Sequence, residues 1–421
     1  MFLKFILYLT KFKNKRFLVL TLLLVNILLP SSIVNAANCG RDDAWYPSSA
    51  TTDAPVSQST ISISSNSNQL VQAIKGTDGK LYSRIASTLP QGPTNWNEWI
   101  EGNGITVKSE PELVEFKDAS TNYLLVSAFG TDNGLYVRKL YIGNDYVASW
   151  TNWNRGGSIT LKSIPVTSYL STGAFASKPI ILQSGFGTDN GLYTRTSTDG
   201  EIWTSWNRGG NITLASKPEQ VLLEDKLIQF ARGTDNGLYS RYTLDGLNWT
   251  SWLRNSGDIT VLDETSTVYH DFKMTNLKKL QQAVRGTDKG VYFRSSSNGI
   301  DWSEWVRLGS ITALEKPSLK NYLVCQIFYE MNLYVLGTDN KLYEFENKVN
   351  DTPSFGLDLG FKWIPESNNT YAGNVSQNTF LELIGTPGVR SYAPEGTVQA
   401  IRGNDNKVYT RLSNWFITIF N

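Results

Sequence analysis

The chain of 421 residues is long enough for two or three ordinary domains or for one large repeat fold. Charged residues make up 18% of it and aromatic residues 12%, which excludes a disordered chain, since disorder requires high charge and few aromatic residues. The first 36 residues hold five of the 39 basic residues and no acidic one, so the remainder carries 34 basic against 38 acidic side chains. This mildly acidic balance, without a basic run, excludes nucleic acid as a partner.

The N-terminal segment has the order of a secretory leader. A basic start that ends at Arg16 is followed by an apolar run from Phe17 to Leu29, then by Pro30, and Ala36 supplies the small residue expected before a cleavage site. This order predicts a signal peptide over residues 1–36 and a secreted, extracellular mature protein. The alternative is an uncleaved anchor, but this run of 13 residues falls short of the ~20 that span a bilayer. We therefore expect no stable membrane insertion after cleavage.

One signature recurs along residues 37–421. Its clearest copy runs from Gly233 to Arg241 and reads Gly-Thr-Asp-Asn-Gly-Leu-Tyr-Ser-Arg. Spacings of 46 to 66 residues separate successive copies, so seven copies fill the mature chain. The copies begin at Gly76, Gly130, Gly187, Gly233, Gly286, Gly337 and, with Asn in place of Thr, Gly403.

Each copy predicts a four-stranded antiparallel meander. In the fourth copy, an apolar stretch precedes the Asp-Asn-Gly turn, an alternating stretch follows it, and an Asp245-Gly246 turn leads to a third strand with two tryptophans. A Lys-Pro segment then leads to a fourth strand, such as Glu219–Leu223. Such a sheet cannot bury both faces alone, and radial stacking solves this. The sequence therefore predicts an all-β, seven-bladed β-propeller rather than a linear array or two sandwiches.

The last copy is too short for a complete blade. It starts at Gly403 and the chain ends at Asn421, which leaves at most three strands around its turn. Ring closure in propellers commonly uses both chain ends in one blade. We therefore expect the missing outer strand to come from residues 40–66.

Ten of the 13 tryptophans form pairs with two residues between them. The pairs are Trp96/Trp99, Trp150/Trp153, Trp203/Trp206, Trp249/Trp252 and Trp302/Trp305, with single tryptophans at Trp363 and Trp415 in the last two copies and Trp45 outside the pattern. In an extended strand, residues three apart point to opposite faces. One ring of each pair is then free to pack against the next blade, and both a packing role and a sugar-platform role stay open.

The run from Trp203 through Asn207-Arg208-Gly209-Gly210 to Thr213, then Lys217-Pro218 and the Gly233 signature, resembles the repeat of the Photorhabdus lectin family. The resemblance covers nearly the whole mature chain and is strongest in copies two to five. It implies a seven-bladed propeller that binds fucose or O-methylated sugars of cell-surface or extracellular glycans in pockets between blades. The ten paired tryptophans are then the candidate sugar-binding residues. Copies six and seven depart from the pattern, because both lack the pair and Glu344 replaces the repeated arginine.

Several signals for other functions are weak. The Asp199-Gly200 hairpin is similar to the Asp-box of sialidases, which is a structural turn. The repeated arginines are Arg84, Arg138, Arg195, Arg241, Arg294 and Arg411, and they are spread around the ring rather than gathered in one catalytic site. His270 is the only histidine, and the Asp-Asn-Gly turn lacks the alternating oxygen ligands that calcium needs. We expect no catalytic residues, cofactor or metal.

Two alternatives to a multivalent lectin remain: a protein-interaction propeller in which the tryptophans only pack blades, and a sialidase-like glycan hydrolase. The oligomeric state is open. The two cysteines, Cys39 and Cys325, form a disulfide or remain as free thiols after export.

Overall fold

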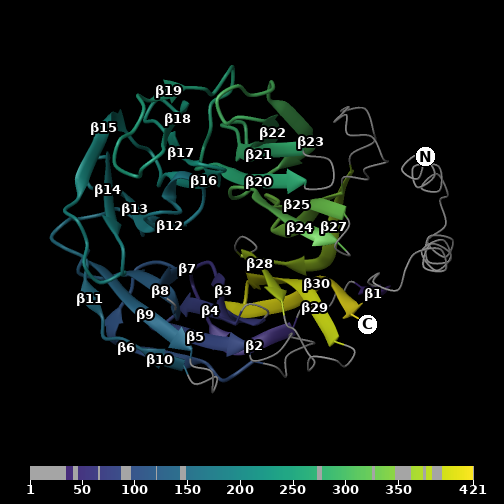
Figure 1. Cartoon of the computed structure of the whole chain (residues 1–421). Coiled ribbons are helices and arrows are strands. Elements are labelled where there is room, and N and C mark those ends of the chain that lie inside the picture. The colour runs from purple at the N-terminus through teal and green to yellow at the C-terminus, as the bar shows by residue number, and fades with distance from the viewer. Residues whose placement is uncertain are drawn as a thin grey trace.

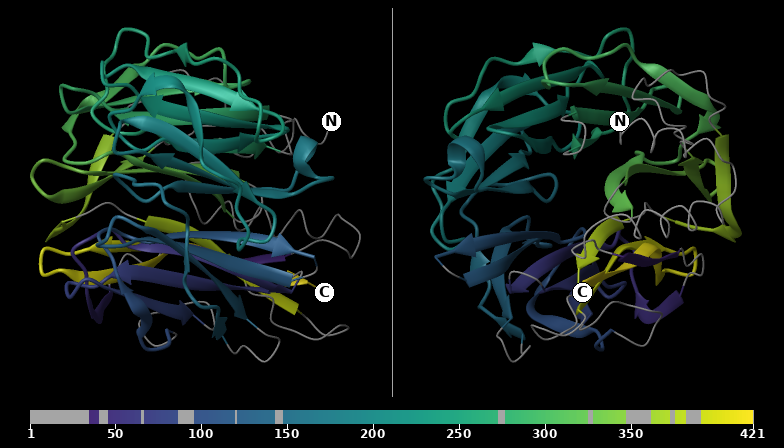
Figure 2. Two further views of the ribbon diagram at one scale, coloured as in Figure 1. Left: turned by 90° about the vertical axis from the view of Figure 1, so that its left-hand side faces the viewer. Right: turned by 45° about the vertical axis from the view of Figure 1, so that its right-hand side comes forward.

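The computed structural model describes residues 35–40, 46–64, 67–86, 96–119, 121–142, 148–272, 277–324, 328–346, 362–372, 376–381 and 391–420. In this part of the chain, seven antiparallel sheets stand side by side around a ring (Figure 1). Their strands run between the two faces of the ring, as the side view in Figure 2 shows. The predicted seven-bladed propeller of four-stranded blades is therefore confirmed.

Blades are numbered here by the copies of the signature. Blade one contains β3 (Ser57–Ser64), β4 (Ser67–Lys75), β5 (Lys80–Ala86) and β6 (Ile100–Thr106). Blade two contains β7 (Glu112–Asp118), β8 (Thr121–Phe129), β9 (Leu135–Ile142), β10 (Ala148–Trp150) and β11 (Asn154–Arg155). Blade three contains β12 (Val166–Leu170), the 3-10 turn η2 (Gly173–Phe175), β13 (Ile180–Phe186), β14 (Gly191–Ser197) and β15 (Asn207–Thr213). Blade four contains β16 (Glu219–Leu223), β17 (Lys226–Arg232), β18 (Leu238–Thr243) and β19 (Leu253–Arg254).

The remaining blades repeat this order from the inner to the outer strand. Blade five contains β20 (Ser266–Phe272), β21 (Leu277–Arg285), β22 (Gly290–Ser296) and β23 (Val306–Thr312). Blade six contains β24 (Ser318–Val324), β25 (Phe328–Leu336), β26 (Lys341–Glu346) and β27 (Lys362–Thr370). Blade seven contains β28 (Ser376–Leu381), β29 (Ser391–Arg402) and β30 (Lys407–Phe420), with β1 (Asn35–Gly40) and β2 (Tyr46–Thr51) from the other end of the chain.

The ring is closed at blade seven by both ends of the described chain. β1 and β2 each pair antiparallel with β30, so N-terminal segments supply the outer edge of the last sheet. The inner strands β3, β7, β12, β16, β20, β24 and β28 each contact the next, and β28 contacts β3. The expected outer strand from residues 40–66 is present as β2, and β1 extends the same edge.

The recurring signature is a tight turn between the second and third strands. In blade three, Asn190 has a φ of 63°, and the Asp189 carboxylate accepts the Gly191 N–H at 2.9 Å and the Tyr193 hydroxyl at 2.9 Å. A Cβ at Gly187 would lie 2.6 Å from the Asp189 Oδ1, which explains the glycine at the start of each copy. Both oxygens of the Asp189 carboxylate thus accept hydrogen bonds within the turn.

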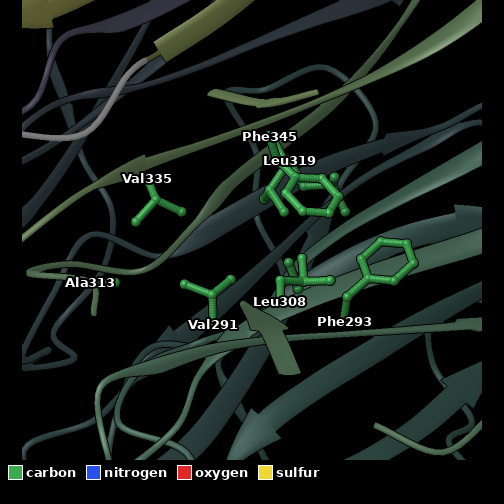
Figure 3. Packing of buried hydrophobic residues seen from close by; sticks show 9 residues of the cluster. Val291, Phe293, Leu308, Ala313, Leu319, Val335 and Phe345 are labelled. Atoms are coloured by element: carbon green, nitrogen blue, oxygen red, sulfur yellow. The ribbon is translucent and has the colours of Figure 1, made fainter. Parts of the chain in front are cut away.

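Apolar side chains fill the space between blades. Figure 3 shows one such core, where Phe293 and Leu308 of blade five pack with Leu319, Val335 and Phe345 of blade six. All five are buried. At roughly 25 cal/mol per Å² of apolar surface removed from water, such packing is the main force that joins one blade to the next.

Acidic side chains also join neighbouring inner strands. Glu112 of β7 accepts the Thr167 N–H of β12 at 2.7 Å, and Glu219 of β16 accepts the Thr267 N–H of β20 at 2.7 Å. Burial raises the pKa of both carboxyl groups to about 7. Each carboxylate thus provides an acceptor for a backbone N–H group that the sheet itself leaves unpaired.

Two predictions fall largely outside the described residues. Residues 1–34 of the expected signal peptide are not described, and neither is Cys325. Cys39 lies in β1, where its backbone pairs with Phe416 of β30, and the disulfide stays a prediction. Among the described residues, no helix is long and apolar enough to cross a bilayer.

Candidate functional site

Each tryptophan pair in blades one to five encloses one arginine of the third strand. In blade four, the Arg241 guanidinium carbon lies 4.3 Å from the Trp249 ring centroid and 4.6 Å from that of Trp252. The other four sets have distances of 3.9 to 4.5 Å, within the range of cation–π contacts. They are Arg84 with Trp96 and Trp99, Arg138 with Trp150 and Trp153, Arg195 with Trp203 and Trp206, and Arg294 with Trp302 and Trp305.

The expectation that paired tryptophans point to opposite faces is wrong. The chain is not a continuous strand between them: Trp249 forms an isolated bridge with Thr243, and the outer strand begins only at Leu253. Between them, the Thr250 hydroxyl accepts the Tyr242 N–H at 3.0 Å, which takes the place of a ladder bond. This irregular stretch turns both rings toward the same guanidinium.

The guanidinium is held by hydrogen bonds to its own blade and to the preceding one. Arg241 Nε donates to the Gln229 side-chain oxygen at 2.8 Å, and Nη1 donates to the Gly209 carbonyl of blade three at 2.9 Å. Arg195 repeats both bonds, to Gln183 at 2.8 Å and to Gly156 at 2.8 Å. Burial lowers the pKa of Arg195 and Arg241 to about 9, which leaves both charged at neutral pH. The arginine is therefore a rigid, positively charged support beneath the tryptophan rings.

In blades two to five, the second tryptophan of the pair also donates its N–H across the blade junction. Trp206 donates to the Gly156 carbonyl at 3.3 Å, and Trp252 donates to the Gly209 carbonyl at 3.1 Å. A Cβ at Gly209 would lie 2.6 Å from Arg241 Nη2, so the approach seen at this junction leaves no room for a side chain there. These tryptophans have a structural role between blades, yet all ten paired rings remain partly exposed.

Two cavities lie over these assemblies, one at each of two successive junctions. The cavity between blades two and three has a volume of about 740 Å³ and is lined by Trp203, Trp206 and Arg195, with Gly156 and Gly157 opposite. The cavity between blades three and four has about 510 Å³ and has the corresponding lining from Trp249, Trp252 and Arg241, with Gly209 and Gly210 opposite. Both volumes fall in the range of small-molecule sites.

Blade six lacks this assembly. Glu344 is buried at the position of the repeated arginine and accepts the Tyr334 hydroxyl at 2.7 Å, and Tyr334 takes the position of the repeated glutamine. In blade seven, Arg411 keeps its bond to Gln399 at 2.7 Å. The side chains of Trp363 and Trp415 are outside the described set, as is all of Trp45.

Blade two has the tryptophans and the arginine but not the glutamine. Val126 pairs with Arg138 in the position where the other complete blades have Gln opposite Arg. The Arg138 Nε is buried and has no hydrogen-bond partner among the described residues. The five assemblies are therefore not equivalent.

The Asp-Gly hairpins that lead into the tryptophan pairs are structural turns. The Asp199 carboxylate accepts the N–H groups of Glu201 and Ile202, both at 2.8 Å. Gly200 is buried against Phe116 and Leu125 of blade two. In blades three to five, the hairpin glycine thus packs against side chains of the preceding blade, which agrees with a structural role for the Asp-box-like motif.

The sequence reasoning found the tryptophans but missed the groups that position them. Arginine was recognised as a repeated residue and was left out of the site, and glutamine was not singled out. A signal was present, because Gln and Arg are always 12 residues apart, as in Gln72/Arg84, Gln183/Arg195, Gln229/Arg241 and Gln282/Arg294. The Arg-Gly-Gly run after the pair also marks the carbonyl that the next blade uses.

No protein-family model and no curated protein matches this chain. Among solved structures, the chain is similar to the BP39L lectin from Burkholderia pseudomallei, with 11% identity over 84% of this chain and 98% of that one, and a TM-score of 0.58. It also matches the fucose-specific lectin from Aleuria aurantia, with 10% identity over 76% and 97% of the two chains and a TM-score of 0.44. The GH93 α-L-arabinofuranosidase of Fusarium graminearum has 12% identity, coverage of 72% and 92%, and a TM-score of 0.47.

At these identities the similarity concerns the fold alone, and the two TM-scores below 0.5 are too low to add to it. The fold of the chain is that of a seven-bladed β-propeller, and a lectin is among the solved structures that share it.

Proposed function

We propose that this protein is a multivalent carbohydrate-binding propeller without catalytic activity. The observation that carries the proposal is the repeated cavity between blades, in which two partly exposed tryptophan rings are fixed over a buried arginine. Sugar rings have apolar C–H faces that fit an indole surface, and their hydroxyl groups fit nearby polar side chains. In the cavity between blades three and four, exposed Asn211, Asn248 and Ser251 are such neighbours.

Fucose-type or O-methylated sugars are the proposed ligands. The resemblance of the repeats to those of the Photorhabdus lectin family supports this choice, and the solved structures with a similar fold include lectins. Each site should bind a monosaccharide weakly, because so small a ligand offers few atoms to bury. Five sites on one rigid ring raise the avidity for a dense glycan surface by roughly 10²–10⁴.

Export is part of the proposal. The basic start, the apolar run and the small residue Ala36 support a secretory signal peptide, and the partners are then glycans outside the cell. Asn35 and Ala36 lie in β1, so cleavage after Ala36 would still leave Asn38–Gly40 to pair with β30.

A protein-interaction propeller is the second candidate. The hydrogen bonds from Trp206 and Trp252 to carbonyl groups of the preceding blade favour it, since they explain one tryptophan of each pair without a ligand. The partial exposure of the first tryptophan of each pair is left unexplained on that account. A glycan hydrolase is a third candidate, which an assay for hydrolysis tests.

A glycan array with the mature protein, followed by titration with L-fucose and its methyl ethers, tests the proposal. Trp249→Phe and Trp252→Phe form a matched pair, because Trp252 donates to the Gly209 carbonyl and Trp249 Nε1 has no partner among the described residues. Trp249→Phe should weaken binding between blades three and four with little change in melting temperature. No binding at millimolar sugar would contradict the proposal, and release of monosaccharide from an array glycan would favour the hydrolase.

A further inference from the structure

One repeat position differs between junctions at the edge of the proposed sugar sites. It is the residue directly after the glycine of the Asp-Gly or Asn-Gly hairpin, here called the rim residue: Glu201 in blade three, Leu247 in blade four and Ile300 in blade five. Glu201 lines the cavity between blades two and three, and Leu247 lines the cavity between blades three and four. The inference below rests on the proposed function.

The rim side chain cannot turn into the protein. Gly246 is buried with a φ of 75°, and a Cβ there would overlap Ile180 of blade three. The Asp245 carboxylate fixes the next residues by accepting the N–H groups of Leu247 at 2.8 Å and Asn248 at 2.7 Å. Leu247 is consequently 66% exposed although it belongs to a rigid turn. An apolar side chain held in water beside a cavity is a surface that gains from contact with a ligand.

The rim between blades two and three is charged. The Glu201 carboxylate lies 2.6 Å from the Lys139 ammonium of blade two, and the Glu201 side chain is 57% exposed. The exposed Arg155 lines the same cavity and pairs with Asp132 at 3.2 Å. Hydroxyl groups can exchange hydrogen bonds with this ion pair, whereas an apolar group placed there would remove water from it without compensation.

The rim between blades three and four is not charged at the matching place. Thr196 takes the repeat position of Lys139 and lines the cavity together with Leu247. The cation that lines this cavity at its outer strand, Arg208, forms an ion pair with Asp189. Between blades four and five, Tyr242 and Ile300 occupy the same two positions, and Ile300 is 42% exposed.

We infer that the rim residue sets which sugar each junction prefers. The sites at Leu247 and Ile300 prefer sugars that carry an added apolar group, such as a methyl ether, because that group buries apolar surface against the rim. The site at Glu201 prefers the parent sugar with free hydroxyl groups. One ring then presents two kinds of site to a heterogeneous glycan surface.

The experiment follows each junction separately by 19F NMR of protein labelled with 5-fluorotryptophan. Signals of Trp203, Trp206, Trp249 and Trp252 are assigned by single Trp→Phe changes, and the protein is titrated with L-fucose and its mono-O-methyl ethers. For at least one ether, the gain in affinity over L-fucose should be about fourfold greater at the Trp249/Trp252 pair, as expected for one buried methyl group.

Exchange of the rim residues makes the test reciprocal. Leu247→Glu should remove the preference for the ether at the Trp249/Trp252 pair, and Glu201→Leu should create it at the Trp203/Trp206 pair. Ile202→Ser is the matched control, because Ile202 is 78% exposed in the same turn and does not line the cavity.

Equal preferences at both junctions, or preferences that the exchanges do not move, would overturn the inference and leave the proposed function standing. If no sugar shifts any of the four signals, both the inference and the proposed function fail.

Discussion

Two blade junctions of the same ring are built from equivalent strands and differ in what lies between them. Between blades three and four, Arg241 and its two tryptophans support an open cavity of about 510 Å³. Between blades five and six, Phe293, Leu308 and Phe345 fill the corresponding region with a closed apolar core (Figure 3). The contrast shows that an apolar core can fill a junction of this ring in place of a tryptophan pair.

A single repeat position separates the two arrangements. Gly209 precedes the blade that contains Arg241, and its lack of a side chain lets the guanidinium reach its carbonyl. Leu308 takes that position before blade six, where Glu344 replaces the arginine. Asn255 takes the position before blade five, and its carbonyl still accepts a hydrogen bond from Arg294, so it is the leucine that accompanies the loss of the guanidinium in blade six.

The largest effect on stability is expected at the closed junction. Phe345→Ala should lower the free energy of unfolding by about 3–5 kcal/mol, because it leaves a cavity in the core between blades five and six. Sugar binding at the Trp249/Trp252 pair should persist in whatever fraction stays folded. Chemical denaturation and sugar titration of the same sample check both statements. A loss of sugar affinity without a loss of stability would contradict the claim that the closed junction contributes to stability and the open junction to binding.

Arg241→Lys tests the open junction. Lysine keeps the charge, but it cannot donate hydrogen bonds to both the Gln229 side chain and the Gly209 carbonyl while it stacks against two rings. We expect the free energy of unfolding to fall by about 2–3 kcal/mol. Sugar binding at this junction should be lost, with the Trp203/Trp206 site unchanged. Binding that survives at full affinity would show that the guanidinium does not organise the site.

Gly209→Ala asks whether the small residue is required. The added Cβ would lie 2.6 Å from Arg241 Nη2, so the junction must shift, at a cost of about 1–3 kcal/mol. Asn255→Ala is the control one blade further on, because Asn255 already has a Cβ and its carbonyl still accepts from Arg294 Nη1 at 2.6 Å. Equal melting temperatures for Gly209→Ala and the wild type would refute the steric argument.

Val126→Gln should produce the smallest effect, and in the opposite direction. It supplies Arg138 with the acceptor that Gln229 provides for Arg241, and the buried Nε of Arg138 has no partner among the described residues. We expect stability to rise by up to about 1 kcal/mol. A lower melting temperature would mean that blade two packs around Val126 in a way that excludes the bond.

The fold could be predicted from the sequence because its signals are local. The turn of the signature requires one residue with positive φ, and it requires a carboxylate two residues before the N–H group that it accepts. Residues that meet both requirements recur seven times in the sequence. The tryptophan pairs were equally visible. Their orientation was not, because it depends on the break in the strand between Trp249 and Trp252 and on a carbonyl from another blade. Local periodicity carries no information about such contacts.

The most direct test of the central claim is a crystal structure of the mature protein grown with L-fucose or one of its methyl ethers. We predict sugar density against the tryptophan pairs between blades one to five and at Trp96/Trp99, and none between blades five and six. Density only outside the blade junctions, or tryptophan cavities that stay empty in crystals equilibrated with millimolar sugar, would contradict the account.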